Sequence, residues 1–187
     1  MSSLYDLFEI PIGFTETTLE AVPDCDLNRY GGLWYVIACK PTLVEVFACN
    51  AIERYTITGN NVQNDFSFKN NTNENAHVFT IPQRGFVQTN TKWKLSPFWP
   101  IVMPYMIIEL DTEKYEYVVV GYPSRDYVWI MCRTPIMDAG LYDTLIGRLQ
   151  TVHKYDLTGL RKIPQIWSEK EERERLTETE IKSLGTI

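Results

Sequence analysis

Near its amino-terminal end the sequence reads Asp26-Leu27-Asn28-Arg29-Tyr30-Gly31-Gly32-Leu33-Trp34-Tyr35, a polar turn followed by a β-forming run. Glycine adopts backbone angles that other residues rarely reach, so Gly31 and Gly32 allow a sharp bend directly before the large indole of Trp34. A large side chain of this kind can close one end of a β-barrel. We therefore predict that a strand begins at Trp34 and that this indole closes the floor of a β-barrel.

Short β-rich segments separated by turn residues follow Trp34. We predict eight strands, at residues 33–40, 48–58, 62–69, 76–81, 86–95, 105–111, 115–122 and 126–133. The short turns between several of them are typical of antiparallel neighbours. Eight such strands can close on themselves, which removes exposed edges and leaves room for one small ligand. The predicted fold class is all-β, an eight-stranded antiparallel up-and-down β-barrel.

Two helices are predicted after the last strand. Asp138 can cap a helix over 139–154 that we expect to flank the barrel with one apolar face. That face carries Leu141, Leu145, Leu149 and Val152. Residues 168–184 read as a charged C-terminal helix, either a solvated tail or a partner-binding helix. We divide the chain into a lead-in at 1–25, the barrel with its flanking helix at 26–167, and a charged tail at 168–187.

Composition limits the kind of partner. The chain has 187 residues, of which 44% are hydrophobic, and a formal net charge of -6, so we expect one globular domain and no nucleic-acid partner. The first residues place acids among short apolar runs, a pattern that does not match a secretory signal. We expect a cytoplasmic protein, with peripheral contact to membranes as a further option.

The cysteines and histidines do not indicate a metal or cofactor site. Cys25, Cys39, Cys49 and Cys132 are expected to be thiols, although an even number would permit two disulfides in a secreted protein. There is no Cys-x-x-Cys motif and no paired histidine spacing. We therefore expect no metal, no cofactor and no catalytic residue.

A second motif supplies a partner for Trp34. The run Pro123-Ser124-Arg125-Asp126-Tyr127-Val128-Trp129-Ile130-Met131-Cys132-Arg133-Thr134-Pro135 ends the eighth predicted strand. In an eight-stranded meander the start of the first strand and the end of the eighth lie at the same end. We predict that Arg133 stacks on Trp34, a cation–π contact worth about 0.5–2 kcal/mol. The alternative is that Arg133 is a surface charge and Trp34 an ordinary core residue.

The opposite end of this barrel is its mouth, formed by loops 41–47, 70–75, 96–104 and 122–125. Two of these loops are unusually apolar, and apolar loop residues need a surface to cover them. The candidates are the cavity itself, a second subunit and a membrane. A peripheral membrane contact or a homodimer through residues 96–104 is therefore predicted. The mouth residues are Val44, Phe47, Phe98, Trp99, Ile101 and Met103.

Alternation along each strand indicates which side chains face inward. In 48–58 neither face is cleanly apolar, and we favour the face that carries Tyr55. Each predicted lining residue would be ordinary core if the barrel were filled. The predicted ligand-binding residues are Val36, Ala38, Tyr55, Phe66, Phe68, Trp93, Met106, Tyr117, Val119, Tyr127, Trp129 and Met131.

Several motifs together resemble the lipocalin family, in particular the branch of bacterial lipocalins, apolipoprotein D and plant temperature-induced lipocalins. They are the Gly-x-Trp signature at Gly32 and Trp34, the Pro-Phe-x-Pro-Ile segment at 97–101, the run that ends at Pro135, and residues 155–165. The resemblance implies a calyx that carries a small hydrophobic ligand such as a fatty acid, lysophospholipid or sterol, without catalysis in most members. This chain departs from many relatives by Val36 in place of Glu.

Two other functions remain open. One lipocalin relative, a prostaglandin D synthase, uses a cavity thiol, and Cys49 lies in the corresponding region, so a thiol-dependent lipid-modifying enzyme is one alternative. A small buried cysteine is the simpler interpretation of Cys49. The second alternative is a docking protein that binds a membrane or a partner through residues 96–104 and leaves the calyx empty.

Overall fold

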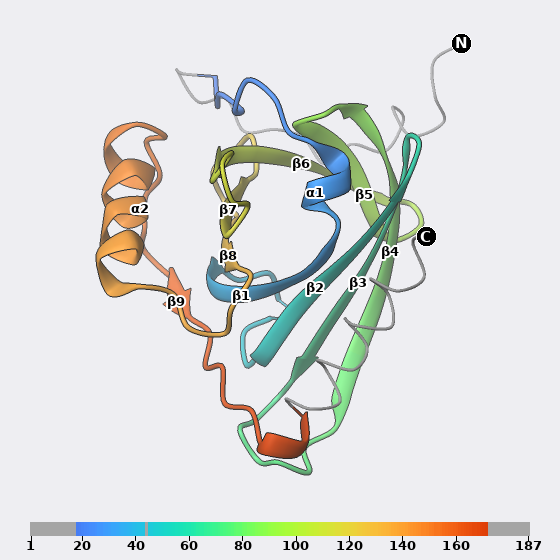
Figure 1. Cartoon of the computed structure of the whole chain (residues 1–187), viewed down its shortest axis with the longest axis vertical. Helices are drawn as coiled ribbons and strands as arrows, with labels where there is room; N and C mark the ends of the chain where they lie inside the picture. Colours follow the sequence, from blue (N-terminus) through green and yellow to red (C-terminus); the bar gives the residue numbers. More distant parts are fainter. Residues whose placement is uncertain (1–17, 44, 172–187) are drawn as a thin grey trace.

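The computed structural model describes residues 18–43 and 45–171, which form a closed antiparallel β-barrel (Figure 1). The elements are α1 (Leu27–Tyr30), β1 (Gly32–Lys40), β2 (Cys49–Thr58), β3 (Asn61–Lys69), β4 (Val78–Thr89), β5 (Lys92–Phe98), β6 (Ile101–Leu110), β7 (Tyr117–Gly121), β8 (Val128–Cys132), α2 (Ala139–Thr151) and β9 (Arg161–Lys162). Each of the first eight strands pairs with its sequence neighbours, and β8 pairs with β1. The predicted fold is confirmed.

The barrel has a seam between β1 and β2. Backbone pairing joins them only over residues 32–35 of β1, and the second half of β1 pairs with β9 instead. Where the two strands part, the side-chain amide of Gln165 donates at 2.9 Å to the carbonyls of Val36 and Ala51. The seam is therefore closed by the C-terminal segment rather than by a continuous β-ladder.

The largest differences from the predicted strand boundaries lie in β4, β5 and β6. The predicted strands 76–81 and 86–95 imply a turn at residues 82–85. In the structure β4 runs through this region, and the turn lies at Asn90 and Thr91. Gly85 accounts for the difference, because a Cβ there would lie 1.9 Å from the carbonyl oxygen of Lys94 on β5. The glycine permits close approach of two strands instead of a turn. Likewise, the expected loop 96–104 is mostly the continuation of β5 and β6, which meet at Phe98 and Ile101.

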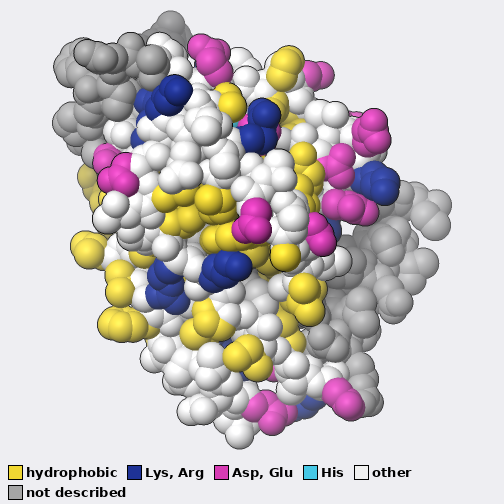
Figure 2. All heavy atoms as spheres, turned by 90° about the vertical axis from the view of Figure 1, so that its left-hand side faces the viewer, with side chains coloured by type: hydrophobic (Ala, Val, Ile, Leu, Met, Phe, Trp, Pro, Cys, Tyr) yellow, Lys and Arg dark blue, Asp and Glu magenta, His cyan; other side chains and the backbone are white. Residues whose placement is uncertain are grey.

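Helix α2 packs on the outside of the barrel, on the left of Figure 1. Asp138 accepts a hydrogen bond from the backbone nitrogen of Leu141 at 2.9 Å and so caps the helix. Leu145 and Leu149 are buried against the barrel, whereas Val152, predicted on the same face, is exposed. Figure 2 looks onto this side of the molecule, where hydrophobic side chains lie among basic and acidic ones.

A second contact ties the end of α2 to the barrel. The carboxylate of Glu109 on β6 accepts hydrogen bonds from Arg148 Nε at 2.8 Å and from His153 Nε2 at 2.6 Å. Burial raises the pKa of Glu109, but the hydrogen bonds from His153 and Arg148 outweigh that effect and lower the pKa overall. The ionised carboxylate therefore holds the helix end in place.

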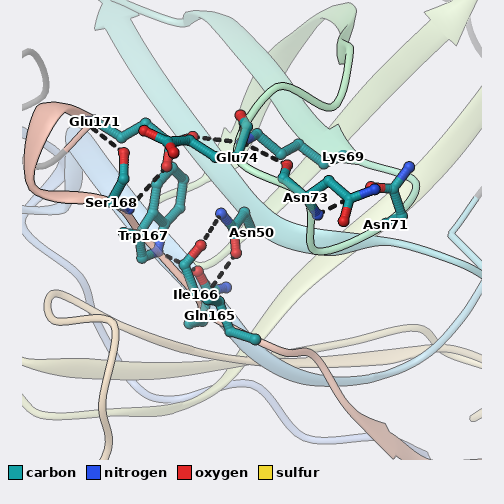
Figure 3. Close-up of polar contacts among 10 residues, drawn as sticks. All are labelled: Asn50, Lys69, Asn71, Asn73, Glu74, Gln165, Ile166, Trp167, Ser168 and Glu171. Atoms are coloured by element: carbon teal, nitrogen blue, oxygen red, sulfur yellow. Dashed lines mark hydrogen bonds and ion pairs between the residues drawn. The ribbon is translucent and has the colours of Figure 1, made fainter.

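The C-terminal segment, residues 165–171, lies beside the start of β2 and the end of β3 (Figure 3). The Asn50 amide pairs with the backbone of Ile166, whose nitrogen donates to Asn50 Oδ1 at 2.7 Å. Ser168 and Glu171 then cap each other reciprocally. Finally, the buried ammonium of Lys69 at the end of β3 bonds Glu171 Oε1 at 2.5 Å and the Glu74 carbonyl at 2.8 Å. These contacts fasten residues 165–171 to the start of β2 and the end of β3.

The lead-in and the charged tail are described only in part. Leu19 is buried between the barrel and Tyr155, and Val22 donates from its backbone to the carbonyl of Ile107 at 2.9 Å. The predicted C-terminal helix lies outside the described residues from 172 onward. Among the helices that the structure describes, none is long and apolar enough to cross a membrane.

Candidate functional site

The closed end of the barrel is built on Trp34 and Arg133. Arg133 Cζ lies 3.6 Å from the centroid of the Trp34 ring, which confirms the predicted stack. The Trp34 side chain is fully buried, and its Nε1 donates to the Tyr30 carbonyl at 2.9 Å. Gly32 has a φ of 91°, a left-handed conformation that favours glycine. Gly31 has a φ of -51°, so only one of the two glycines has a backbone angle that favours glycine.

Above this pair lies a layer of aromatic rings. Trp93 and Tyr105 stack with centroids 4.8 Å apart, and Tyr30 and Tyr55 pack edge-on against Trp93. The hydroxyl of Tyr105 hydrogen-bonds that of Tyr30 and donates to that of Tyr55 at 2.9 Å. Burial raises the pKa of all three tyrosines well above the usual value, so they are neutral. The floor is therefore dense and uncharged.

A cavity of about 510 Å³ lies between this floor and the mouth. Most of its lining is apolar, and side chains of β2 to β8 together with the β1–β2 loop contribute to it. The described lining residues are Thr42, Leu43, Glu45, Glu53, Tyr55, Asn64, Phe66, Ile81, Gln83, Leu95, Pro97, Phe98, Ile101, Met103, Pro104, Tyr105, Val120, Tyr127, Trp129 and Met131. Such a pocket, apolar with a few polar groups, is typical of a binding site for a small hydrophobic molecule.

Two acidic side chains stand out in this lining. Glu45, from the β1–β2 loop, accepts from Trp129 Nε1 at 2.8 Å and from the hydroxyl of Thr42 at 2.7 Å. Glu53 on β2 accepts a hydrogen bond from the Asn64 amide. Burial raises the pKa of Glu53 to about 8, the hydrogen bond from Asn64 opposes this rise, and the charge of Glu45 adds to it. Glu53 is consequently protonated at neutral pH.

The structure separates the predicted ligand-binding residues into three groups. Five of them line the cavity, namely Tyr55, Phe66, Tyr127, Trp129 and Met131. Three belong to the inner core without lining the cavity, namely Val36, Phe68 and Trp93. Four lie on the outer surface of the barrel, toward α2, namely Ala38, Met106, Tyr117 and Val119. The choice of the Tyr55 face of β2 is confirmed.

The four outward residues correct the predicted faces, and each error has a physical cause. A bulge at Ile37 in β1 reverses the alternation, so Val36 belongs to the inner core and Ala38 to the outer cluster. In β6 and β7 helix α2 buries the outer face, so both faces are apolar and alternation does not distinguish them. The inner residues there are Tyr105, Ile107, Val118 and Val120.

Sequence reasoning missed the polar lining residues, although a signal for them existed. Glu53 shares its face with Tyr55, and Asn64 shares its face with Phe66, so alternation already places both inward. Polar side chains are uncommon in a pocket that holds hydrocarbon, so an apolar pattern alone does not select them.

The mouth residues fall into exposed and lining sets. Phe98, Ile101 and Met103 line the cavity, and Phe98 is also 62% exposed. Phe47 and Trp99 are 74% and 58% exposed. Val44 lies outside the described residues. Leu43, not predicted by itself, lines the cavity and is 94% exposed, so apolar side chains of two segments surround the opening.

All four cysteines are buried free thiols; Cys39, Cys49 and Cys132 lie on barrel strands, whereas Cys25 precedes α1. Cys49 is not among the described residues that line the cavity, and its sulfur lies 3.8 Å from the Phe47 carbonyl oxygen. Within residues 18–43 and 45–171, no group of three or more His, Cys, Asp or Glu side chains is arranged to hold a metal ion.

Comparison with known families agrees with this geometry. A family model described as a lipocalin-like domain matches residues 25–165. The chain belongs to the lipocalin family. This lipocalin is 27% identical to temperature-induced lipocalin-1 of Arabidopsis thaliana, over 79% of this chain and 83% of that protein. It is also 27% identical to the outer membrane lipoprotein Blc of Vibrio cholerae, over 72% of this chain and 80% of that protein.

Solved structures share the architecture of this lipocalin at low sequence identity. Insecticyanin from the tobacco hornworm Manduca sexta superposes with a TM-score of 0.58 at 19% identity, covering 82% of this chain and 86% of that one. Lobster apocrustacyanin A1 gives a TM-score of 0.58 at 11% identity, covering 81% and 92%. At these identities the likeness shows the fold alone.

Proposed function

We propose that this lipocalin binds and carries a single-chain lipid, the class that includes fatty acids and lysophospholipids, with its apolar chain inside the barrel. The observation that carries the proposal is the cavity of about 510 Å³ with a mainly apolar lining. Burial of hydrocarbon in such a pocket contributes roughly 25 cal/mol per Å² of apolar surface removed from water. The position of Cys49 outside the cavity lining favours a carrier over a thiol enzyme.

The test is a titration of delipidated protein with lysophosphatidylcholine, followed by calorimetry and by tryptophan fluorescence, to which Trp129 in the cavity lining contributes. We expect saturable binding. Ile81→Trp, which adds bulk inside the cavity, should weaken binding at least tenfold. Thr80→Trp places the same ring at the preceding position of β4, which is exposed, and this variant should bind lysophosphatidylcholine like the wild type. Equal affinity of both variants, or no binding by the wild type, would contradict the proposal.

We further propose that the protein collects its ligand at a membrane surface. The mouth surface, defined as Leu43, Phe47, Phe98 and Trp99, exposes large apolar side chains directly beside the opening of the cavity. Exposed apolar groups gathered in this way mark contact sites for membranes or proteins. A membrane suits this position because a single-chain lipid could pass from the bilayer into the cavity without crossing water.

Sedimentation with neutral phosphatidylcholine vesicles tests this step. The double variant Phe98→Ser/Trp99→Ser should lose most of its vesicle binding. Ile136→Ser removes another exposed apolar side chain, which follows the last strand of the barrel, and should sediment like the wild type. If neither variant changes sedimentation, the membrane role is wrong. A concentration-dependent dimer abolished only by the double variant would instead assign the mouth surface to a second copy of the chain.

A further inference from the structure

Polar side chains from three neighbouring strands meet beside the floor of the cavity. Glu53 on β2, Asn64 on β3 and Gln83 on β4 all line it. The Asn64 amide nitrogen donates to Glu53 Oε2 and, at 3.4 Å, to Gln83 Oε1. The amide oxygen of Asn64 has no hydrogen-bond partner within residues 18–43 and 45–171, although the residue is only 1% exposed. A buried acceptor without a partner costs free energy, which a ligand that donates to it would recover.

The charge of the lining points to the kind of donor. Glu45 and Glu53 are both acidic, and none of the described lining residues is Lys, Arg or His. Glu45 already accepts hydrogen bonds from Trp129 and Thr42, so its carboxyl oxygens act as acceptors in this lining. A carboxylate ligand would therefore meet Glu53 and an unsatisfied acceptor at the polar end of this cavity, with Glu45 elsewhere in the lining and no basic residue among the described lining to pair with it.

We propose that the cavity selects a single-chain amphiphile whose polar end is an ammonium group, which enters head first and donates to Asn64 Oδ1 and to the carboxylate of Glu53. This inference rests on the proposed function and names the chemistry of its ligand. An ammonium group carries three donors and no acceptor, so it matches a site that offers acceptors. Its hydrocarbon tail then extends toward the apolar mouth, along Phe98, Ile101 and Met103.

Binding of an ammonium group should depend on pH through Glu53. The titratable groups whose charges act on or respond to Glu53 are Glu45, Cys39, Tyr55 and Tyr105, and none of these is basic. Below a pKa of about 8, Glu53 must release its proton to pair with the ligand, so affinity should rise up to tenfold per pH unit and level off above that value.

The experiment compares dodecylamine, dodecanol and dodecanoate, each below its micelle concentration, by calorimetry between pH 6 and pH 9. At pH 8 we expect dodecylamine to bind at least tenfold more tightly than the other two compounds. Glu53→Gln should abolish this preference and its pH dependence while keeping an apolar cavity. Glu113→Gln, which removes an exposed acid from the β6–β7 connection, should retain both.

The outcomes separate the two proposals. If none of the three compounds and no lysophosphatidylcholine binds, the proposed function itself is wrong. If dodecanoate or dodecanol binds as tightly as dodecylamine, or if Glu53→Gln keeps the preference, only the ammonium inference is overturned. Should Glu53→Gln fail to fold, the order of the three compounds and the pH slope of the wild type still decide the question.

Discussion

Arg133 lies flat against Trp34 and at the same time donates to five backbone carbonyls, those of Arg29, Tyr30, Gly31, Leu33 and Tyr115, at 2.7–3.3 Å. Its guanidinium therefore joins the ends of the first and last barrel strands through α1. Burial lowers the pKa of Arg133 to about 10, which leaves it charged at neutral pH.

Replacement of Arg133 by alanine should therefore destabilise the fold without affecting ligand binding. We expect the free energy of unfolding to fall by roughly 2–4 kcal/mol, since a cation–π contact and several charge-assisted hydrogen bonds are lost. Chemical denaturation measures this loss. Arg29→Ala, which removes an exposed cation 4.2 Å from the Tyr115 ring, should cost less than about 1 kcal/mol. A loss of lipid affinity at unchanged stability would contradict the structural role.

Glu53 should make the stability of the empty protein depend on pH. Its pKa is about 8 in the folded state and about 4.5 when unfolded, so the folded state binds more protons between these values. The contribution of Glu53 to the free energy of unfolding should accordingly be largest below pH 4.5 and decrease as the pH rises to about 8. Urea denaturation of wild type and Glu53→Gln across this range isolates the effect. The difference between them should grow with pH in favour of the variant, and a constant difference would refute the assignment.

Loss of Glu171 should release the C-terminal segment from the barrel. In Glu171→Ala the buried Lys69 ammonium keeps only the carbonyls of Asn73 and Glu74, and Ser168 loses its capping partner. We expect the amide of Ser168 to exchange with deuterium at least tenfold faster. Glu74→Gln changes a neighbouring exposed acid but keeps the carbonyl that binds Lys69, so its exchange should match the wild type. Equal protection in both variants would show that the ion pair does not hold the segment.

Two glycine-to-alanine substitutions should have opposite effects. At Gly85 the added methyl group would lie 1.9 Å from the carbonyl oxygen of Lys94, so the strands must separate and we expect a loss of more than about 2 kcal/mol. At Gly147, inside α2, nothing lies within 4 Å of the added carbon, and alanine should stabilise the protein by about 0.5–1 kcal/mol. Thermal unfolding of both variants measures these two changes in stability. A Gly85→Ala variant as stable as the wild type would contradict the close approach of β4 and β5.

The features that could be predicted from sequence were those fixed by local pattern and by topology. Trp34 and Arg133 stand at the ends of the first and last strands, so closing the barrel brings them together. Alternation also placed Tyr127, Trp129 and Met131 correctly, because no irregularity interrupts β8.

The rest depends on contacts that no local pattern carries. The bulge at Ile37 moved Ala38 to the outside, and the helix over β6 and β7 made both faces of those strands apolar. Gly85 looks like a turn residue until the backbone of β5 is placed against it. The polar site at Asn64 depends on its hydrogen bonds to Glu53 and Gln83, which lie on two other strands.

The amide of Gln165 that bridges Val36 and Ala51 has a consequence for synthesis of the protein. Val36 and Ala51 lie more than a hundred positions earlier in the chain than Gln165, so the barrel wall between β1 and β2 is incomplete until Gln165 has been added. On the ribosome the barrel therefore stays unsealed along that line until Gln165 has emerged, more than a hundred residues after the two strands that it joins.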